Sequence, residues 1–350
     1  MPNVVEPGRQ QQEVRRRRVS MLATYALSAL VGSGSGLFWL MKVEAKMARR
    51  AIGPAHLGLV HHEAVHPSHV SDAGTAPLEL LVLGDSSAAG YGMTSTYDAP
   101  PGLLASGLAH IAGRAVHVRS EAFVGARSSA LMSQLERAGI PTPDVCVVVV
   151  GANDVTHAVR PGAAADQLGT LVRRLTDEGV AVVVGTCPDL GTITPLPQPL
   201  RLVARIWARQ LARAQTVAVA RAGGRAVSLG SLLGADFYAA PGELFGSDRF
   251  HPSLAGYASM CAALLPSVAA SLGYVDEDDE TAHAGLLPIS FGAARAARIA
   301  GSETVSASTA MTDSGTGSRV RRRNVALVRV LQRPRLLTPP LPSWLREQAT

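Results

Sequence analysis

Five short apolar runs, separated by longer amphipathic stretches, constrain most strongly how this 350-residue chain folds. The runs cover residues 78–83, 115–119, 145–150, 180–184 and 225–229. Helices are expected near residues 100–112, 127–138, 163–178, 200–222 and 253–272. The runs at 145–150 and 180–184 contain no polar residue, and uninterrupted apolar runs are typical of parallel strands that are buried on both faces. Alternation of such strands with helices predicts an α/β fold, a three-layer α/β/α (flavodoxin-like) domain with a central parallel sheet, over residues 78–274.

The N-terminal residues are expected to lie outside this domain. Residues 1–18 form a basic arm, and residues 19–41 contain no charged side chain. At about 1.5 Å per residue, the second segment is long enough to cross a bilayer core of about 30 Å. We therefore expect one N-terminal transmembrane anchor. Because the denser cluster of arginines precedes it, the domain is expected to be extracytoplasmic. The alternatives are a cleaved signal peptide, with secretion of the protein, and a buried soluble helix.

Residues 42–77 are interpreted as a linker, because Gly, Pro, His and Ser are frequent and no period is sustained. The string His62-Glu63-Ala64-Val65-His66 nevertheless matches His-Glu-x-x-His, which on a helix brings together two zinc ligands and a general base. Pro67 follows directly and disfavours a continuing helix, and a third ligand is not evident nearby. A zinc peptidase is kept as an alternative, but we expect no metal.

The composition changes again after Tyr274. An acidic run at 276–280 is followed by a segment rich in Ala, Ser, Thr, Gly, Arg and Pro, so residues 275–350 are interpreted as a disordered, Arg-rich tail. Much of the net charge of +6 lies at the two ends of the chain. The central domain is closer to neutral, and no nucleic-acid partner is expected.

The first apolar run ends on Gly84-Asp85-Ser86, and Gly90 and Gly92 follow. A phosphate-binding loop of the Gly-x-x-x-x-Gly-Lys type needs a lysine after its last glycine, and none is present here. The other interpretation is a reactive serine. A serine becomes a good nucleophile only beside a base, which needs an orienting carboxylate, and the developing oxyanion needs hydrogen-bond donors.

Three further segments contain groups of these kinds. Asp248 and His251 lie three residues apart in the string DRFHPS, where a local turn would let the carboxylate reach one ring nitrogen. Asn153 follows the run at 145–150, and Gly125 follows the run at 115–119. Both positions are expected at the carboxyl ends of strands, where ligand sites of such sheets lie.

The segments GDSSAAGYG, Gly125, GAND and DRFHPSLAGY occur in an order and spacing that resemble the SGNH (GDSL-type) hydrolase family, over residues 78–272. The resemblance implies a serine ester hydrolase without metal or cofactor. It implies Ser86 as nucleophile, His251 as general base and then acid, and Asp248 as the group that orients the histidine. The backbone N–H groups of Ser86 and Gly125 and the side chain of Asn153 would form the oxyanion hole.

The resemblance is less specific about the substrate. It is compatible with acetyl, short-chain or lipid esters of a small molecule, a glycan or a lipid. The segments 93–105 and 186–199 are expected to shape the rim of the site. Asp85 and Asp154 are expected to brace their loops, and His157 to be a loop residue. A non-catalytic ligand-binding module on the same fold is the second alternative.

Overall fold

The computed structural model describes residues 43–44, 62–68, 75–139, 142–230, 232–275, 287–288, 293, 296, 302–306 and 327–332. The chain divides into two units, Met1–Ala51 and Ile52–Thr350. Only Val43 and Glu44 of the first unit are described, and the described strands all belong to the second unit. The predicted basic arm and transmembrane anchor lie outside the described residues.

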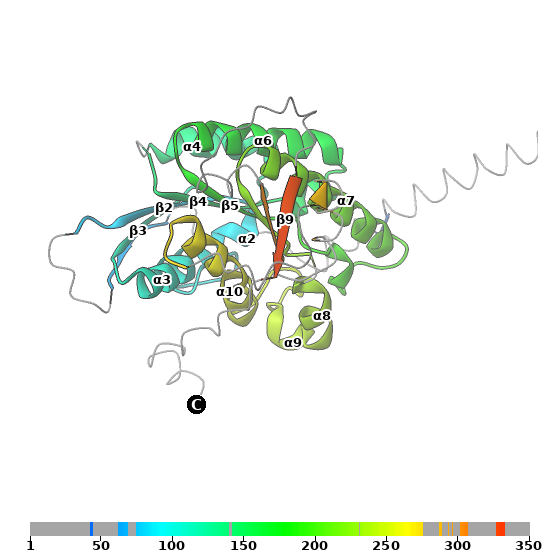
Figure 1. Cartoon of the computed structure of the whole chain (residues 1–350). Helices are drawn as coiled ribbons and strands as arrows, with labels where there is room; N and C mark the ends of the chain where they lie inside the picture. The colour runs from blue at the N-terminus through cyan, green and yellow to red at the C-terminus, as the bar shows by residue number, and fades with distance from the viewer. Residues whose placement is uncertain are drawn as a thin grey trace, which may run out of the picture. The chain divides into compact units, whose positions relative to one another are not determined.

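All five predicted strands form, each ending within two residues of its predicted bounds. They are β2 (Leu78–Gly84), β3 (Val116–Ser120), β4 (Val145–Val149), β5 (Ala181–Gly185) and β6 (Arg225–Val227). They pair in parallel in the order β3-β2-β4-β5-β6, as Figure 1 shows for β3, β2, β4 and β5. Among these five parallel strands β2 comes first in the sequence, and it lies between β3 and β4, which come second and third. This is the flavodoxin-like order.

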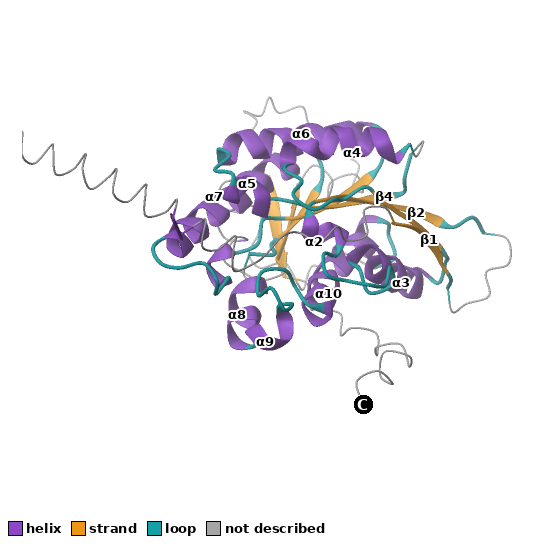
Figure 2. Ribbon diagram, turned by 180° about the vertical axis from the view of Figure 1, so that it is seen from behind, coloured by secondary structure: helices purple, strands orange, loops and turns teal. Residues whose placement is uncertain are grey.

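Helices cover both faces of the sheet, which confirms the three-layer prediction (Figures 1 and 2). One face packs against α3 (Pro100–Ala112) and α10 (Leu254–Ser271). The other packs against α4 (Leu131–Ala138), α6 (Pro161–Asp177) and α7 (Leu200–Arg221). Successive strand residues point to opposite faces. Leu80 and Val82 of β2 therefore join the first core, whereas Leu81 and Leu83 join the second.

The linker prediction was wrong for part of its range, because residues 62–66 form β1 (His62–His66), antiparallel to β3. Its ends, His62 and His66, are buried, whereas Glu63 is exposed and pairs with Arg119 at 2.6 Å. Histidine occupies two of the three inward positions and Ala64 the third, so the alternation of apolar and polar residues typical of a strand is weak. A strand cannot supply the helical geometry of the zinc motif, and the described residues contain no cluster of three or more potential metal ligands. The zinc-peptidase alternative is therefore wrong.

The disordered-tail prediction was also wrong for three segments. These are β7 (Leu287–Pro288), β8 (Ser302–Ser306) and β9 (Leu327–Gln332), which extend the sheet beyond β6 through antiparallel pairs. Ser302, Glu303 and Thr304 of β8 are fully buried. Polar composition suggested exposure, but Glu303 pairs with Arg225 of β6 at 2.9 Å, and the hydroxyl of Ser302 donates to the carbonyl of Ala296 at 3.0 Å. The remainder of the tail after Val275 lies outside the described residues, apart from Ala293 and Ala296.

Short elements connect the layers: α2 (Ser86–Ala89), η1 (Ser128–Ala130), α5 (Ala152–Thr156), η2 (Leu190–Thr192), α8 (Leu232–Ala239) and α9 (Pro241–Leu244). Among the described helices, α10 is long and apolar enough to cross a membrane, but 72% of it is buried inside the domain. Its role in the core, against α3 and the sheet, accounts for that composition.

Candidate active site

The turn after β2 places Ser86 at the start of α2. Gly84 has a φ of 139°, and a Cβ at this position would lie 1.9 Å from the carbonyl oxygen of Val149. Only glycine allows the chain to turn so close to β4. Asp85 then caps α2, because its Oδ1 accepts a hydrogen bond from the N–H of Ser87 at 2.9 Å. Ser86 is consequently the first helical residue, with its backbone N–H at the helix N-terminus.

The hydroxyl of Ser86 belongs to a hydrogen-bonded chain of three side chains. Its Oγ lies 3.1 Å from Nε2 of His251, and Nδ1 of His251 lies 2.6 Å from Oδ2 of Asp248. Because an ionised carboxylate only accepts, Nδ1 is the protonated nitrogen, and Nε2 is free to accept from the serine. The structure thus brings together the three residues that the sequence assigned to one site, across 165 positions of sequence.

A local turn fixes the carboxylate of Asp248. Its Oδ1 accepts hydrogen bonds from the backbone N–H groups of Phe250 (2.9 Å) and His251 (3.0 Å). Burial alone would raise the pKa of Asp248, but the hydrogen bonds from the His251 side chain and from these backbone groups outweigh burial and lower that pKa. Asp248 therefore remains ionised near neutral pH and can stabilise a positive charge on the imidazole.

Asp85 lies in the turn between β2 and α2 and joins two loops. Its Oδ1 caps Ser87, and its Oδ2 accepts from the N–H of Gly151 at 3.2 Å. The carboxyl is fully buried, and burial raises its pKa to about 6 despite these two hydrogen bonds. The bracing role predicted for Asp85 agrees with this geometry, since it connects the end of β2 to the loop that leads into α5.

Gly125 and Asn153 occupy the neighbouring loops. Gly125 (φ 85°) follows β3 in a turn that the N–H of Phe123 ties to the carbonyl of Gly84 at 3.3 Å. Asn153 is the second residue of α5, two positions after the N-cap residue Gly151. Within the described part of the chain, neither the N–H groups of Ser86 and Gly125 nor the side-chain amide of Asn153 donates to another protein group. All three donors are thus available to a ligand.

Asp154 connects these two loops to each other. Its carboxylate accepts from the N–H of Ser128 at 3.1 Å and from its hydroxyl at 2.8 Å, and both residues are buried. Burial raises the pKa of Asp154, and the bonds from Ser128 oppose this effect. The predicted bracing role again agrees with the geometry. His157 is exposed, and its Nδ1 lies 2.8 Å from the carbonyl oxygen of Asn153, as expected of a loop residue.

Two contacts of the site were not predicted. The ring of Tyr91 lies over the imidazole of His251 at a centroid distance of 4.0 Å, and its carbonyl accepts from the hydroxyl of buried Tyr257 at 3.0 Å. Gln134 of α4 bonds both backbone groups of Gly84, accepting from its N–H and donating to its carbonyl oxygen at 2.8 Å each. Tyr91 lies inside a recognised motif and could have been found there, but nothing local distinguishes Gln134.

The geometry permits acyl transfer. An ester carbonyl bound next to the Ser86 hydroxyl would have the imidazole of His251 nearby to accept the serine proton. The carboxylate of Asp248 lies on the other side of that imidazole, and the adjoining loops carry unpaired hydrogen-bond donors. This is the combination that attack on a carbonyl requires. No group in this arrangement needs a metal ion as partner.

Comparison with known proteins identifies the same family that the sequence motifs resemble. Over 183 residues the chain is 46% identical to a GDSL-like esterase of Mycobacterium tuberculosis, a match that covers 52% of this chain and 58% of that protein. The chain therefore spans little more than half the length of this curated relative. Two solved structures resemble it less closely. A lipase/acylhydrolase from Enterococcus faecalis has 20% identity and a TM-score of 0.45, over 57% of this chain and 99% of its own.

The second solved structure is that of an extracellular lipase from Streptomyces rimosus, with 16% identity and a TM-score of 0.44, over 55% of this chain and 99% of its own. Residues 82–259, about half of the chain, match a family model. That range contains every residue of the hydrogen-bonded chain from Ser86 to Asp248, together with Gly125 and Asn153. The chain belongs to the GDSL-like lipase/acylhydrolase family.

Proposed function

We propose that this protein is a carboxylic ester hydrolase that works through an acyl-enzyme on Ser86. The observation that carries the proposal is the continuous hydrogen-bonded chain from Ser86 through His251 to Asp248, with distances of 3.1 and 2.6 Å. Family membership supports ester hydrolysis in general. A non-catalytic binding module would not need such a chain, and nothing in the geometry favours it.

The first half of the reaction transfers the acyl group. The Oγ of Ser86 attacks the ester carbonyl while Nε2 of His251 accepts its proton, and Asp248 stabilises the imidazolium that forms. The negative charge on the carbonyl oxygen is stabilised by the N–H groups of Ser86 and Gly125 and by the amide of Asn153. The imidazolium then gives its proton to the leaving alcohol oxygen, and the acyl group stays on Ser86.

The second half releases the acid. His251 takes a proton from a water molecule, the resulting hydroxide attacks the acyl carbonyl, and the same donors stabilise the second oxyanion. Collapse of this intermediate returns the proton from His251 to Ser86. Because the imidazole must be unprotonated to act as base, we expect hydrolysis to slow in acid.

Two adjacent serines give a matched test. Ser86→Ala is expected to abolish hydrolysis of p-nitrophenyl acetate and covalent labelling by a fluorophosphonate probe, because both require the nucleophile. Ser87→Ala keeps the backbone N–H that Asp85 caps and removes a hydroxyl outside the hydrogen-bonded chain, so it should retain both. Turnover by Ser86→Ala at the wild-type rate, or labelling lost equally in both variants, would overturn the proposal.

The substrate and location are proposed from the sequence. The uncharged segment 19–41 would anchor the protein in a membrane with the domain on the extracytoplasmic side, or be removed on secretion. Acetyl, short-chain or lipid esters fit this setting. Hydrolysis rates across p-nitrophenyl esters from acetate to palmitate distinguish an acetyl esterase, with a maximum at two carbons, from a lipase-like enzyme.

A further inference from the structure

Helix α7 carries five arginines and no acidic residue, and its outward face is partly apolar. Its inward face, which includes Leu211, Gln215 and Val219, is buried. On the outward face Leu202 and Ile206 are 52% and 49% exposed. They lie four residues apart and therefore one above the other on the helix. Two large aliphatic side chains are therefore exposed to water next to each other on one face of this helix.

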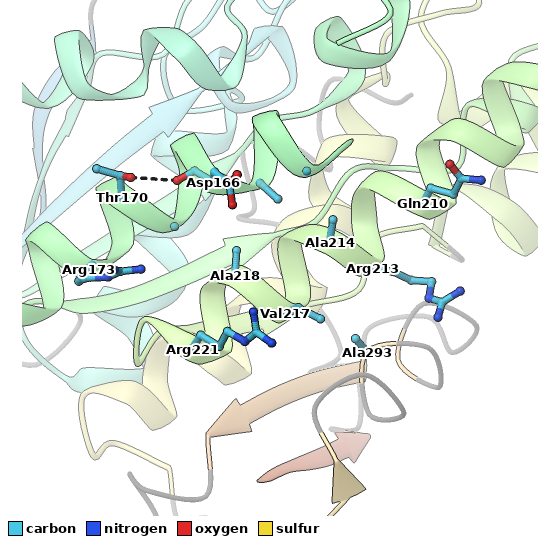
Figure 3. Close-up of a pocket in the computed structure, with 13 residues that line it drawn as sticks. Asp166, Thr170, Arg173, Gln210, Arg213, Ala214, Val217, Ala218, Arg221 and Ala293 are labelled. Atoms are coloured by element: carbon cyan, nitrogen blue, oxygen red, sulfur yellow. Dashed lines mark hydrogen bonds between the residues drawn. The ribbon is translucent and has the colours of Figure 1, made fainter. Parts of the chain in front are cut away.

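The same face continues into an open groove of about 560 Å³ that is lined by α6, by α7 and by Ala293 of the C-terminal tail (Figure 3). Its floor is made of small residues, among them Gly169, Ala214 and Ala218. Three arginines line it: Arg173 from α6, and Arg213 and Arg221 from α7. Asp166 also lines the groove, so its net charge is positive.

The three arginines are not neutralised within the described part of the chain, where no ion pair includes them. In contrast, Arg205 and Arg209 of the same helix both pair with buried Asp189, at 3.3 and 3.1 Å. Arg201, the fifth arginine of α7, is in no ion pair within the described residues and does not line the groove. What distinguishes the groove is that three arginines without an ion pair lie together there. An amphipathic surface of exposed aliphatic and unpaired basic side chains is typical of a helix that lies on an anionic membrane.

This face is also connected to the active site. Asp189 follows β5 and caps η2, in the segment expected to shape the rim of the site, and it pairs with Arg205 and Arg209 of α7. Between these two arginines, Nε1 of Trp207 donates to the carbonyl of Val159, in the loop that follows the helix of Asn153, at 3.1 Å. Contact of α7 with a surface would therefore occur next to the loops that border the site.

We propose that the outward face of α7 docks on an anionic phospholipid surface. Leu202 and Ile206 enter the boundary between headgroups and acyl chains, and Arg173, Arg213 and Arg221 contact lipid phosphates. The predicted anchor ends at Met41 and β1 begins at His62, so at most about 70 Å of extended chain separates them, which is within reach of such a surface. Docking extends the proposed function, because it would bring an ester held in that surface to the enzyme.

The three native cysteines are buried, so a fluorophore can be attached selectively at an introduced exposed cysteine. Leu202→Cys in the full chain, labelled with the polarity-sensitive dye NBD, is mixed with vesicles of phosphatidylcholine alone or with phosphatidylglycerol added. We expect a blue-shifted, severalfold stronger emission only with the anionic lipid. Ile206→Cys repeats the measurement at a second site. Glu136→Cys on exposed α4 is the control and should not respond, even if the anchor inserts.

Charge is tested in the labelled background. Arg213→Gln should weaken the vesicle response about fivefold, since each basic residue near such a surface contributes about a factor of five. Arg174→Gln removes an exposed arginine that pairs with Glu178 and does not line the groove, so it should have little effect. No response at either labelled site, an equal response without anionic lipid, or equal effects of the two arginine variants would overturn docking. The readout needs no turnover, so it stands apart from the test of Ser86.

Discussion

Among single residues, Asn153 has the most specific expected effect on the reaction. Its amide is unpaired within the described part of the chain, so its removal should cost little stability. Asn153→Ala is expected to lower kcat by about 10²–10³ with a small change in KM, because the amide bonds the oxyanion rather than the bound ester. Steady-state kinetics check this. A kcat within about threefold of wild type would remove Asn153 from the oxyanion hole.

Asp85 links the site to stability through pH. Its pKa is 3.8 in an ordinary setting and about 6 in the folded protein, so between these values the folded state binds more protons than the unfolded state. Stability must then fall as pH rises from about 4 to 6, and the loss amounts to about 3 kcal/mol once Asp85 is ionised. The ionised form is needed nevertheless, because it accepts from both Ser87 and Gly151.

Asp85→Asn removes this titration while it keeps the shape of the side chain. The free energy of unfolding of the variant, minus that of the wild type, should rise by about 2.5 kcal/mol between pH 4 and pH 8. Urea unfolding at several pH values measures the difference, in which the other titrating groups cancel. A difference that stays constant over this range would show that the carboxyl titrates normally.

The residues of the site differ in how far sequence could identify them. Ser86, Asn153 and His251 each lie in a short string whose side chains suit one chemistry, and each follows a strand or turn that composition predicts. The stacking of Tyr91 on His251 depends on how α2 ends and on the hydroxyl of Tyr257, 166 residues away. Such a contact exists only after the chain has folded.

At the scale of secondary-structure elements, two buried glutamines connect helices to the ends of strands. Gln134 of α4 bonds the N–H and carbonyl of Gly84, one residue before Asp85 and two before Ser86. Gln215 of α7 accepts from the N–H of Cys187 and donates to the carbonyl of Val150, at the ends of β5 and β4. Both side chains are fully buried, so each replaces ladder bonds that the diverging strands no longer make.

Gln134→Leu leaves the Gly84 N–H unpaired and weakens the bonding of its carbonyl, which should cost about 2–4 kcal/mol of stability. Because Gly84 leads directly into Ser86, we also expect kcat and the rate of fluorophosphonate labelling to fall at least about tenfold. Gln215→Leu is the matched control, since it removes a similar pair of bonds from the other loops. Chemical denaturation and labelling kinetics measure both effects. Equal slowing of labelling in the two variants would mean that Gln134 acts through stability alone.

The long elements were predictable because each repeats its pattern. Helix α3 has its predicted bounds, and α7 differs from prediction by one residue, since their apolar positions recur over several turns. Strand β1 has only five residues, and histidine occupies both of its buried ends. So few positions do not establish a period, and pairing with β3 is what makes this segment a strand.

In the whole molecule, the parallel strands form a framework that the tail then extends. Strand β8 pairs with β6 and lies between it and β9, so residues beyond 300 cover an edge that the central five strands would leave open. An uncovered edge exposes unpaired backbone groups and favours aggregation. Sequence could predict the framework from local patterns. It could not predict the extension, because β8 is polar and its partners are 78 positions away.

Substitutions in the ion pair between Arg225 of β6 and Glu303 of β8 test whether this extension is part of the fold. Its nitrogen and oxygen atoms are 2.9 Å apart, Glu303 is fully buried, and the Arg225 side chain is 14% exposed. Removing one partner of a buried pair takes the nearest opposite charge away from the other, so Arg225→Met is expected to cost about 3–5 kcal/mol of stability. The double variant Arg225→Met/Glu303→Met should recover most of that loss, since no charge then remains buried. Thermal and urea unfolding of the wild type, both single variants and the double variant complete the cycle. If β8 did not pack against β6, all three variants would unfold like the wild type, because Glu303 would then be hydrated and neither substitution would change its surroundings.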